Sequence, residues 1–440
     1  MLNFLYSALY SIVLTFLLPF EYLKRPRELR GRWIRERFGL LDPSIATHNA
    51  PLIWVHAVSV GEAIASASLI KKLKERHPSL DIVISTVTDT GRKVAMERMG
   101  DSAGIIYVPF DLPFAIHNTV KRIRPSAFII METELWPNTI RILSELNIPV
   151  LLLNGRISER SFNGYKKLKF FIKDVLKKVS LLCMQERIYA DRIRSLGAEP
   201  ERVRVIGSFK FDTRPSAPVP EWTKALKGPV IIAGSTHRTE EDVVLDAYIK
   251  LKNDFPRLNL IIAPRHPGRF KEVEELVERR GLEYVKRSEI SRQSIAGSPK
   301  AVFDENAIDD RRSPADDRRA SGGLVVILDV MGELSSVYGA SDIAVMGGSF
   351  IGHGGQNPLE PAYWERAIVC GPHMENFPFI DNFYKSKGAL EADSSNLYKI
   401  LKDLLDSPDR MSDMGKVAKG LYEKNAGATE RAVEIIEKYL

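Results

Sequence analysis

The 440-residue sequence has only two cysteines, Cys183 and Cys370, which lie far apart and form no CxxC pair or metal-ligand spacing. A disulfide framework is therefore not expected, and a reducing compartment fits this usage. The sequence also lacks any Asp-x-Asp triplet, any GxSxG and any HExxH. These absences give no support to a metal-chelating diphosphate site, a nucleophile elbow or a zinc protease. We therefore predict no metal and no cofactor.

The remaining composition is that of a globular protein, with 44% hydrophobic and 27% charged residues. The length predicts two or three domains. The formal net charge of +7 can favour nucleic acid, an anionic membrane or an anionic substrate. Much of the surplus lies directly after an apolar segment, which favours the membrane over nucleic acid. These clustered cations are Lys24, Arg25, Arg27, Arg30, Arg32, Arg35 and Arg37.

The apolar segment spans residues 2–20 without a charge, close to the roughly 20 residues that cross a bilayer. Its cations follow it, whereas a signal peptide has them in front. We predict a membrane anchor over residues 1–22, with the rest of the chain on the cytoplasmic side. The alternative is a buried N-terminal helix. Whether the anchor spans the membrane or lies in the interface is open.

Short apolar runs alternate with helical stretches through the rest of the chain, which predicts parallel sheets covered on both faces. The expected strands are 51–57, 81–87, 104–110, 127–134, 148–154, 181–186, 203–208, 228–235, 258–264, 282–288, 324–330, 342–349 and 367–372.

A proline-rich linker at 212–222 divides these strands into two Rossmann-like doubly wound α/β domains, 23–211 and 223–415. Residues 287–323 are polar and predict a flexible insertion, and 416–440 predict a C-terminal helix that packs back on the first domain. Tandem domains of this kind place a ligand in the cleft between them, at the carboxyl ends of the strands.

Carboxylates and a lysine stand at the predicted strand ends of the first domain. Glu62 opens a helix, where a carboxylate either complements the helix dipole or acts as a general base. Glu132 and Glu134 follow another strand and would need a salt-bridge partner or a ligand. Lys210 ends the last strand and is either a phosphate ligand or a surface charge.

The second domain offers sites suited to phosphate. Thr236 is a candidate helix cap, and Arg265 and His266 follow a strand, where a cation can neutralise an anionic leaving group. The most specific segment is GGSFIGHGGQNPLEPA, 347–362. A glycine-rich loop that opens a helix cradles phosphate, and Glu360 one turn further can bind ribose hydroxyls. It matches neither Walker A nor GxGxxG.

The motifs SVGE, METELWPN, NGRIS, GSFKFD, APRHP, MGEL, GGSFIGHGGQNPLEPA and GPH together resemble those of the Kdo (3-deoxy-D-manno-octulosonic acid) transferases of Gram-negative bacteria. The resemblance covers nearly the whole chain. It implies a GT-B glycosyltransferase at the cytoplasmic face of the inner membrane. Such an enzyme moves Kdo from CMP-Kdo to a lipid A precursor, lipid IVA, in lipopolysaccharide core synthesis, with inversion and without a metal.

The resemblance also implies roles for individual residues. Glu62 matches the family's catalytic base, and Glu132 and Lys210 match residues that assist the transition state. The residues that match its CMP-sugar contacts are Arg265, His266, Gly332, Glu333, Leu334, Ser335, Gly355, Asn357, Pro358, Leu359 and Glu360. The long polar insertion departs from the family pattern but falls in a loop.

Two other functions remain open from the residues alone. The first is a GT-B enzyme with another donor, such as a UDP-sugar transferase or an epimerase, which donor binding would distinguish. The second is a membrane-tethered nucleotide-binding scaffold without turnover, in which Glu62 would be dispensable.

Overall fold

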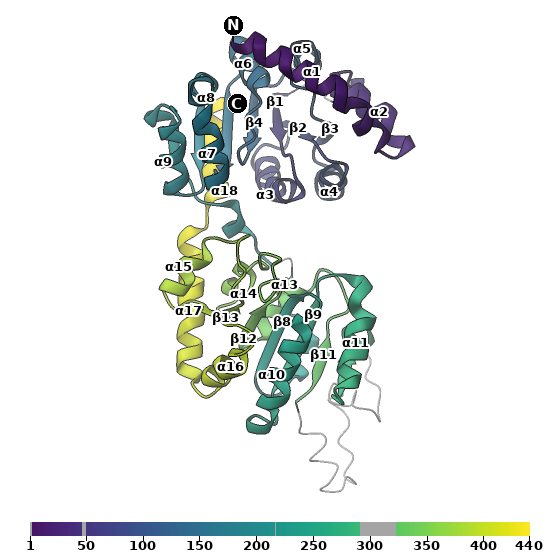
Figure 1. The fold of residues 1–440 in the computed structure, drawn as a ribbon, viewed down its shortest axis with the longest axis vertical. Coiled ribbons are helices and arrows are strands. Elements are labelled where there is room, and N and C mark those ends of the chain that lie inside the picture. Colours follow the sequence, from purple (N-terminus) through teal and green to yellow (C-terminus); the bar gives the residue numbers. More distant parts are fainter. Residues whose placement is uncertain (1, 46–49, 216, 291–322) are drawn as a thin grey trace. The chain divides into compact units, whose positions relative to one another are not determined.

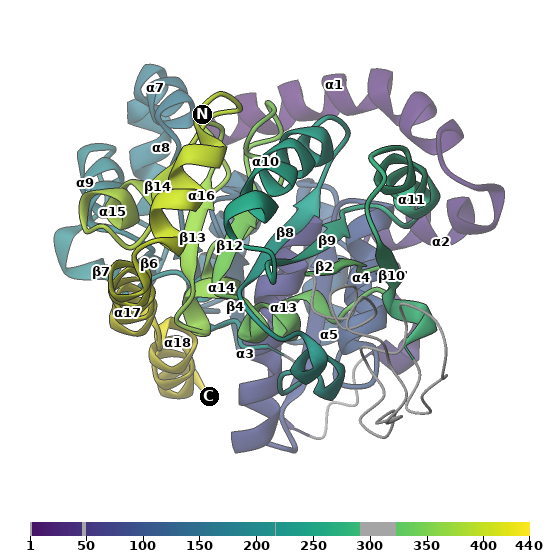
Figure 2. The same cartoon turned by 90° about the horizontal axis from the view of Figure 1, so that it is seen from below.

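The computed structural model describes residues 2–45, 50–215, 217–290 and 323–440. Most of the expected insertion, 291–322, lies outside the described residues. The chain forms two compact units (Figure 1), each with its own core. Strands of the second unit can be followed side by side in Figure 2. Unit 1 is Met1–Asp212 with Asn425–Leu440, and unit 2 is Thr213–Lys424.

Unit 1 contains a seven-stranded parallel sheet in the order β3-β2-β1-β4-β5-β6-β7. Its strands are β1 Leu52–His56, β2 Asp81–Thr86, β3 Gly104–Tyr107, β4 Ala127–Met131, β5 Val150–Gly155, β6 Leu181–Met184 and β7 Val203–Val205. Its helices are α1 Leu2–Leu23, α2 Arg27–Arg37, α3 Val60–Arg76, α4 Asp89–Met99, α5 Pro113–Ile123, α6 Pro137–Glu145, α7 Glu159–Lys167, α8 Lys169–Leu176, α9 Arg187–Ser195 and α18 Ala428–Ile436.

Side chains of this sheet alternate between two apolar layers, as the two-residue period of a strand requires. In β1, Leu52 and Trp54 pack with α5, α6, α8 and α9. Ile53 and Val55 pack with α3, α4 and α18 on the other face. Because both faces are covered, the central strands are mostly apolar.

Unit 2 repeats this architecture, with a parallel sheet in the order β10-β11-β9-β8-β12-β13-β14. Its strands are β8 Val230–Thr236, β9 Asn259–Pro264, β10 Tyr284–Lys286, β11 Val325–Ile327, β12 Ile343–Met346, β13 Ala367–Cys370 and β14 Leu390–Glu391. Its helices are α10 Glu240–Asp254, α11 Phe270–Arg279, α13 Leu334–Val337, α14 Leu359–Tyr363, α15 Ile380–Lys385, α16 Leu397–Leu405 and α17 Pro408–Asn425.

Each strand expected from the sequence is present, and the doubly wound α/β fold is confirmed. β14 was not expected. The C-terminal segment differs from the single helix expected over 416–440, since α17 and α18 are separated at Ala426 and Gly427. Gly427 has a φ of 86°, a left-handed conformation that ends a helix readily.

The start of α18 is capped by a side chain from elsewhere in unit 1. One carboxylate oxygen of Asp212 accepts the backbone N–H of Gly427, and the other accepts that of Thr429 at 2.5 Å. The first N–H groups of a helix have no partner within it, so this carboxylate supplies what a capping residue would. α18 then packs on α3 in the apolar layer.

The basic cluster after the apolar segment, which favours a membrane from the sequence, is not a uniform surface. Arg25 and Arg37 are buried. The Arg25 guanidinium lies 4.1 Å from the ring centroid of Trp33, and Arg37 donates to the carbonyl of Val108 at 2.7 Å. Lys24, Arg27, Arg32 and Arg35 are exposed, while Arg30 is half-buried.

We expect Asp212→Ala to lower the unfolding free energy by about 1–2 kcal/mol, because two backbone donors at the start of α18 lose their acceptor. Thermal unfolding of the full chain measures this. Asp212→Asn keeps an acceptor and should lose less, while Asp101→Ala, in an exposed turn after α4, should change little. An unchanged midpoint for Asp212→Ala would contradict the capping role.

Candidate active site

Both sheets have a switch point, where the strand order reverses and successive helices leave toward opposite faces. It lies between β1 and β4 in unit 1 and between β8 and β12 in unit 2. Ligands of doubly wound folds bind outside the carboxyl ends of the strands at such points. Glu62 and Glu132 follow β1 and β4, and His237 and Gly348 follow β8 and β12. Each unit therefore contributes its own candidate half-site.

Glu62 is buried in the first turn of α3 and belongs to a capping box. Its carboxylate accepts the backbone N–H of Val58 at 2.7 Å and the hydroxyl of Ser59 at 2.9 Å. Ser59 in turn accepts the N–H of Glu62 at 3.3 Å. Glu62 therefore helps to cap the start of α3, and the two bonds that it accepts fix the orientation of its carboxylate.

The same carboxyl group has a raised pKa. Burial raises the pKa of Glu62 to about 7, and the charges of Glu132 and Glu134 add to the rise, whereas the bonds from Val58 and Ser59 lower it. A base whose pKa lies near neutrality combines a useful ionised fraction with a strong pull on a proton. Glu62 can therefore act as a cap and as a general base.

Glu132 directly follows β4 with a φ of 58°, a left-handed conformation that is unfavourable for a side chain with a Cβ. Its N–H is fixed by the carbonyl of Leu153 at 2.9 Å. Glu134 is half-buried, and burial, followed by the charge of Glu132, raises its pKa. Two carboxylates therefore lie close together at this strand end.

Lys210 lies at the far end of the same half-site, in a short 3-10 turn, Phe209–Asp212. Burial lowers the pKa of Lys210, the charge of Arg156 lowers it further, and that of Glu132 raises it. The structure thus brings Glu62, Glu132 and Lys210 into one electrostatic environment, together with Arg156 from the NGRIS motif.

A buried hydrogen-bonded chain supports the turn that carries Glu132 and Glu134. The indole N–H of Trp136 donates to Nε2 of His56 at 3.0 Å, and Nδ1 of His56 lies 3.0 Å from the Ser85 hydroxyl. The Trp136 bond makes Nε2 the acceptor, so Nδ1 carries the proton and donates to Ser85. Burial lowers the pKa of His56 to about 4, which keeps the ring neutral. This chain had not been expected, because it joins residues from three strand ends.

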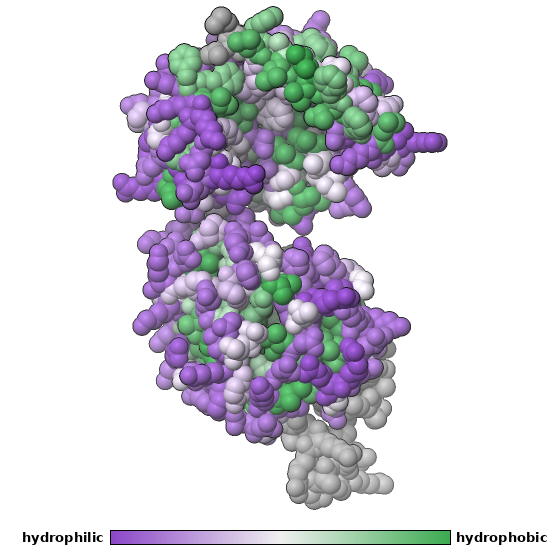
Figure 3. Space-filling view, viewed as in Figure 1, coloured by the Kyte–Doolittle hydropathy of each residue, from purple (hydrophilic) through white to green (hydrophobic). Residues whose placement is uncertain are grey.

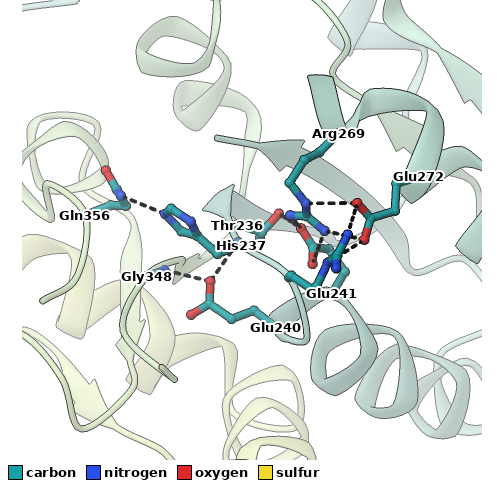
Figure 4. Close-up of polar contacts among 9 residues, drawn as sticks. Thr236, His237, Glu240, Glu241, Arg269, Glu272, Gly348 and Gln356 are labelled. Atoms are coloured by element: carbon teal, nitrogen blue, oxygen red, sulfur yellow. Dashed lines mark hydrogen bonds and ion pairs between the residues drawn. The ribbon is translucent and has the colours of Figure 1, made fainter. Parts of the chain in front are cut away.

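In unit 2, Glu240 ties the end of β8 to the loop after β12. Its buried carboxylate accepts the N–H groups of His237 at 2.9 Å and Gly348 at 2.7 Å (Figure 4). It also accepts the N–H of Phe350 at 3.0 Å. Burial raises the pKa of Glu240, and these three bonds lower it. The glycine-rich loop is therefore anchored at its first turn by a side chain of the neighbouring helix.

Glu241 forms a second fixed pair beside it. Its carboxylate accepts from Arg269 at 2.7 Å and from the hydroxyl of Thr236 at 2.7 Å, and Arg269 also contacts Glu272 (Figure 4). The hydroxyl of Thr236 therefore donates to the Glu241 carboxylate and caps no backbone N–H group of α10. The residue directly before α10 is Thr239. The expectation that Thr236 caps this helix is wrong.

Three histidines converge at the unit 2 switch point. The ring of His237 lies 4.6 Å from that of His353 and 5.6 Å from that of His266, measured between centroids. Gln356 lies 3.5 Å from its Nε2 (Figure 4). Burial lowers the pKa of His237 to about 4, and the charges of His353 and His266 contribute. His237 was not among the predicted site residues, since spacing alone does not reveal this convergence.

The predicted nucleotide contacts lie around this cluster. Arg265 and His266 are exposed after β9, and Arg265 donates its N–H to the carbonyl of Thr236 at 2.9 Å. Glu360 stands in the first turn of α14, after Pro358 and Leu359. Burial raises the pKa of Glu360 to about 7, while a bond from Asn357 and the charge of Arg265 lower it.

Glycine is required where the loop turns. Gly354 and Gly355 have φ values of 79° and 76°, and a Cβ at Gly355 would lie 2.1 Å from the sulfur of Met374. A Cβ at Gly347 would lie 2.3 Å from the carbonyl oxygen of Ser235. The backbone therefore approaches its neighbours too closely for any side chain.

The MGEL segment was expected to contact the nucleotide, but its charged side chain, Glu333, already has a partner within unit 2. The carboxylate of Glu333 forms two 2.8 Å bonds with Arg287, so it is already paired. Gly332 has a φ of 90°, and Leu334 begins α13. The carbonyl of Ser335 accepts the indole N–H of Trp364 at 2.7 Å.

Within the part of the chain that the structure describes, no group of three or more His, Cys, Asp or Glu side chains is arranged to hold a metal ion. The cations of the two half-sites include Lys210, Arg156 and Arg265.

Two Rossmann-type units in one chain define the GT-B class of fold. Among solved structures, Acinetobacter baumannii MurG is similar to this chain, with a TM-score of 0.52, 12% identity, and coverage of 88% of this chain and 99% of that one.

The sequence comparisons are more specific. The model of the family described as 3-deoxy-D-manno-octulosonic-acid transferase (kdotransferase) matches residues 32–213. The 3-deoxy-D-manno-octulosonic acid transferase of Haemophilus influenzae is 32% identical, with coverage of 100% of this chain and 99% of the relative. A transferase of the same name from Bordetella pertussis is 29% identical, with coverage of 98% and 99%. The chain belongs to this transferase family and is a glycosyltransferase.

We expect acid to destabilise the protein through His56. Its pKa is about 4 in the fold, below the ordinary 6.5, so the unfolded chain binds a proton first as the pH falls. The contribution of His56 to the unfolding free energy is fully present above pH 6.5. It is lost between about pH 6.5 and 4, which lowers the unfolding free energy by up to about 3 kcal/mol. Unfolding measured across this range should show a shallower decline in His56→Gln than in the wild type. Equal slopes would contradict this assignment.

We expect Glu240→Gln to weaken nucleotide binding more than it weakens the fold. One amide oxygen replaces two carboxylate oxygens, and the new NH₂ group faces backbone donors, which costs about 1–3 kcal/mol at this buried position. Calorimetric titration with CMP measures the affinity. Glu283→Gln, on the loop between α11 and β10, is the control. Wild-type affinity in Glu240→Gln would show that the loop needs no such anchor.

Proposed function

We propose that this chain transfers Kdo from CMP-Kdo to a lipid A precursor, lipid IVA, with inversion at the anomeric carbon and without a metal, in lipopolysaccharide core synthesis. The observation that carries the proposal is Glu62, a buried carboxyl group with a pKa of about 7 at the switch point of unit 1. The family membership supports the identity of the sugar.

Unit 1 binds the acceptor in this proposal. A sugar hydroxyl is a weak nucleophile, so it needs a base within hydrogen-bond reach. Glu62 accepts the hydroxyl proton as the oxygen attacks the anomeric carbon, and the bond from that carbon to the CMP phosphate oxygen breaks with its electron pair on the phosphate. Glu132 and Lys210 line the same half-site and stabilise the charges that develop.

Unit 2 binds the CMP moiety. Arg265 and His266 face the phosphate, and backbone N–H groups of the anchored glycine loop donate to it. The loop turns at Gly355, whose own N–H donates to the carbonyl of Gly348 at 2.9 Å. Glu360, with Asn357, accepts from the ribose hydroxyls. The segment Gly332–Ser335 contributes mainly its backbone, because Glu333 is paired with Arg287.

Cations and backbone dipoles take the charge of the leaving group in this scheme. CMP departs with an added negative charge, and Arg265, Lys210 and the loop N–H groups compensate it. The absence of an Asp-x-Asp triplet and the supply of fixed cations both support a mechanism without a metal.

Location follows from the acceptor. α1 is long and apolar enough to cross a membrane, by length and composition. The exposed cations after it favour the anionic cytoplasmic leaflet. We infer attachment at the cytoplasmic face of the inner membrane, where a lipid A precursor would be accessible.

The decisive test is transfer of Kdo from CMP-Kdo, generated in situ, to tetraacylated lipid A precursor. We expect the wild type to be active and Glu62→Gln to lose about 10²–10⁴-fold in kcat while still binding CMP. The wild-type rate should rise with pH through about 7, because the base acts in its ionised form.

Glu97→Gln, which removes an exposed carboxylate on α4, is the matched control and should retain wild-type rates. If the wild type is inert with this substrate pair but active with a UDP-sugar, the proposed donor is wrong and a UDP-sugar takes its place. An active Glu62→Gln would leave the family intact and remove Glu62 as the base.

A further inference from the structure

α1 has two different faces along its whole length. Tyr10, Leu14, Leu18 and Tyr22, each four residues apart, pack on the apolar cluster around Trp33 in unit 1. The opposite face is exposed, with Phe4 at 76% and Phe20 at 73% of their full accessibility. Figure 3 shows apolar side chains gathered along the edge of unit 1 where Figure 1 draws α1. The other exposed apolar residues of this face are Leu5, Leu9, Ile12, Val13, Phe16, Leu17 and Leu23.

The packed face is also fixed by polar bonds near its N-terminus. The Tyr6 hydroxyl donates to the carboxylate of Asp111 at 2.9 Å, and the Tyr10 hydroxyl accepts the N–H of Asp111 at 3.3 Å. The side-chain amide of Asn138 donates to the Ser7 hydroxyl at 2.9 Å. Both Asp111 and Asn138 are buried within unit 1.

These bonds decide how α1 can meet a bilayer. A helix of 22 residues is about 33 Å long and could span the hydrocarbon core. If it did so in this packing, Asp111 and the helices around it would enter the hydrocarbon core as well. Exposed backbone groups and charges are strongly disfavoured there. A helix with one packed and one exposed apolar face instead lies in the plane of the interface.

A second exposed apolar site lies beside the N-terminal end of α1. Leu168 and Phe170, at the corner between α7 and α8, are 61% and 79% exposed. The corner is joined to α1 through Phe171, whose ring centroid is 5.7 Å from that of Tyr6. Exposed lysines flank these two apolar residues, namely Lys166, Lys167 and Lys169.

We propose that the outward face of α1 and the α7–α8 corner form one surface that docks on an anionic lipid bilayer, with α1 lying in the plane of the interface. Apolar side chains enter the headgroup region along α1 and at Leu168 and Phe170. Exposed cations stand at both ends of this apolar stripe, on α2 and on the corner, as attraction to anionic headgroups requires. The choice of a lipid bilayer as the partner rests on the proposed function, in which the acceptor is a membrane lipid. The exposed apolar surface itself is independent of that function.

The test uses the full chain with single cysteines that carry an environment-sensitive fluorophore. Cys183 and Cys370 are buried, and burial raises the pKa of both thiols to about 12, so they react poorly. We expect a blue shift for Phe170→Cys with vesicles that contain phosphatidylglycerol, and none for Met96→Cys, 49% exposed on α4 in the opposite helix layer. If Phe170→Cys shows no shift, the α7–α8 corner is not part of the docking surface.

Depth measurements distinguish the two orientations of α1. With lipid-borne quenchers, cysteines at Phe4, Ile12 and Phe20 should lie at similar shallow depths. A spanning helix would instead place Ile12 far deeper than the two ends, and that result would overturn the in-plane orientation.

A charge variant tests the lipid type. Replacing Lys166, Lys167 and Lys169 by Gln should lower binding to anionic vesicles by roughly fivefold per lysine and leave binding to phosphatidylcholine vesicles unchanged. Equal wild-type binding to both vesicle types would contradict the proposal. Kdo transfer to a detergent-solubilised acceptor is the independent readout, since it tests the chemistry without the bilayer.

Discussion

One buried carboxylate, Asp111, connects the apolar N-terminal helix to the turn that carries the candidate catalytic groups. It accepts Tyr6 of α1 and also the N–H groups of Asn138 and Thr139, which open α6. Burial raises its pKa, and these bonds lower it. α6 begins directly after Trp136, so the cap that orients α6 also fixes one end of the turn that holds Glu132 and Glu134. The surface proposed to meet lipid and the proposed acceptor half-site are therefore joined within one rigid part of unit 1.

The two units place a glutamate at the same position, in the first turn of the helix after their first strand, and use it differently. Glu240 accepts three backbone N–H groups and holds the glycine loop. Glu62 accepts one N–H and one hydroxyl and lies near two further carboxylates. The difference in surroundings, and not in residue type, separates a structural anchor from a candidate base.

The sequence alone predicted the architecture well because apolar runs between helices leave few other folds. It missed β14, Leu390–Glu391, since two residues carry no periodicity. It singled out Glu62, Glu132 and Glu360 as candidates through their places at strand and helix ends, and their roles stay predictions. It could not show that Glu333 is paired with Arg287, that His56 supports Trp136, or that Arg25 and Arg37 are buried. These contacts join residues far apart in the chain, so only the tertiary structure reveals them.

The backbone of Glu132 has a consequence for engineering. A glutamate held at a φ of 58° carries a strain of about 1 kcal/mol or more that glycine would not. Selection for thermostability alone would therefore favour glycine at this position and erase a carboxylate from the half-site. If Glu132 has the role proposed above, a library built to stabilise this enzyme should keep residue 132 fixed.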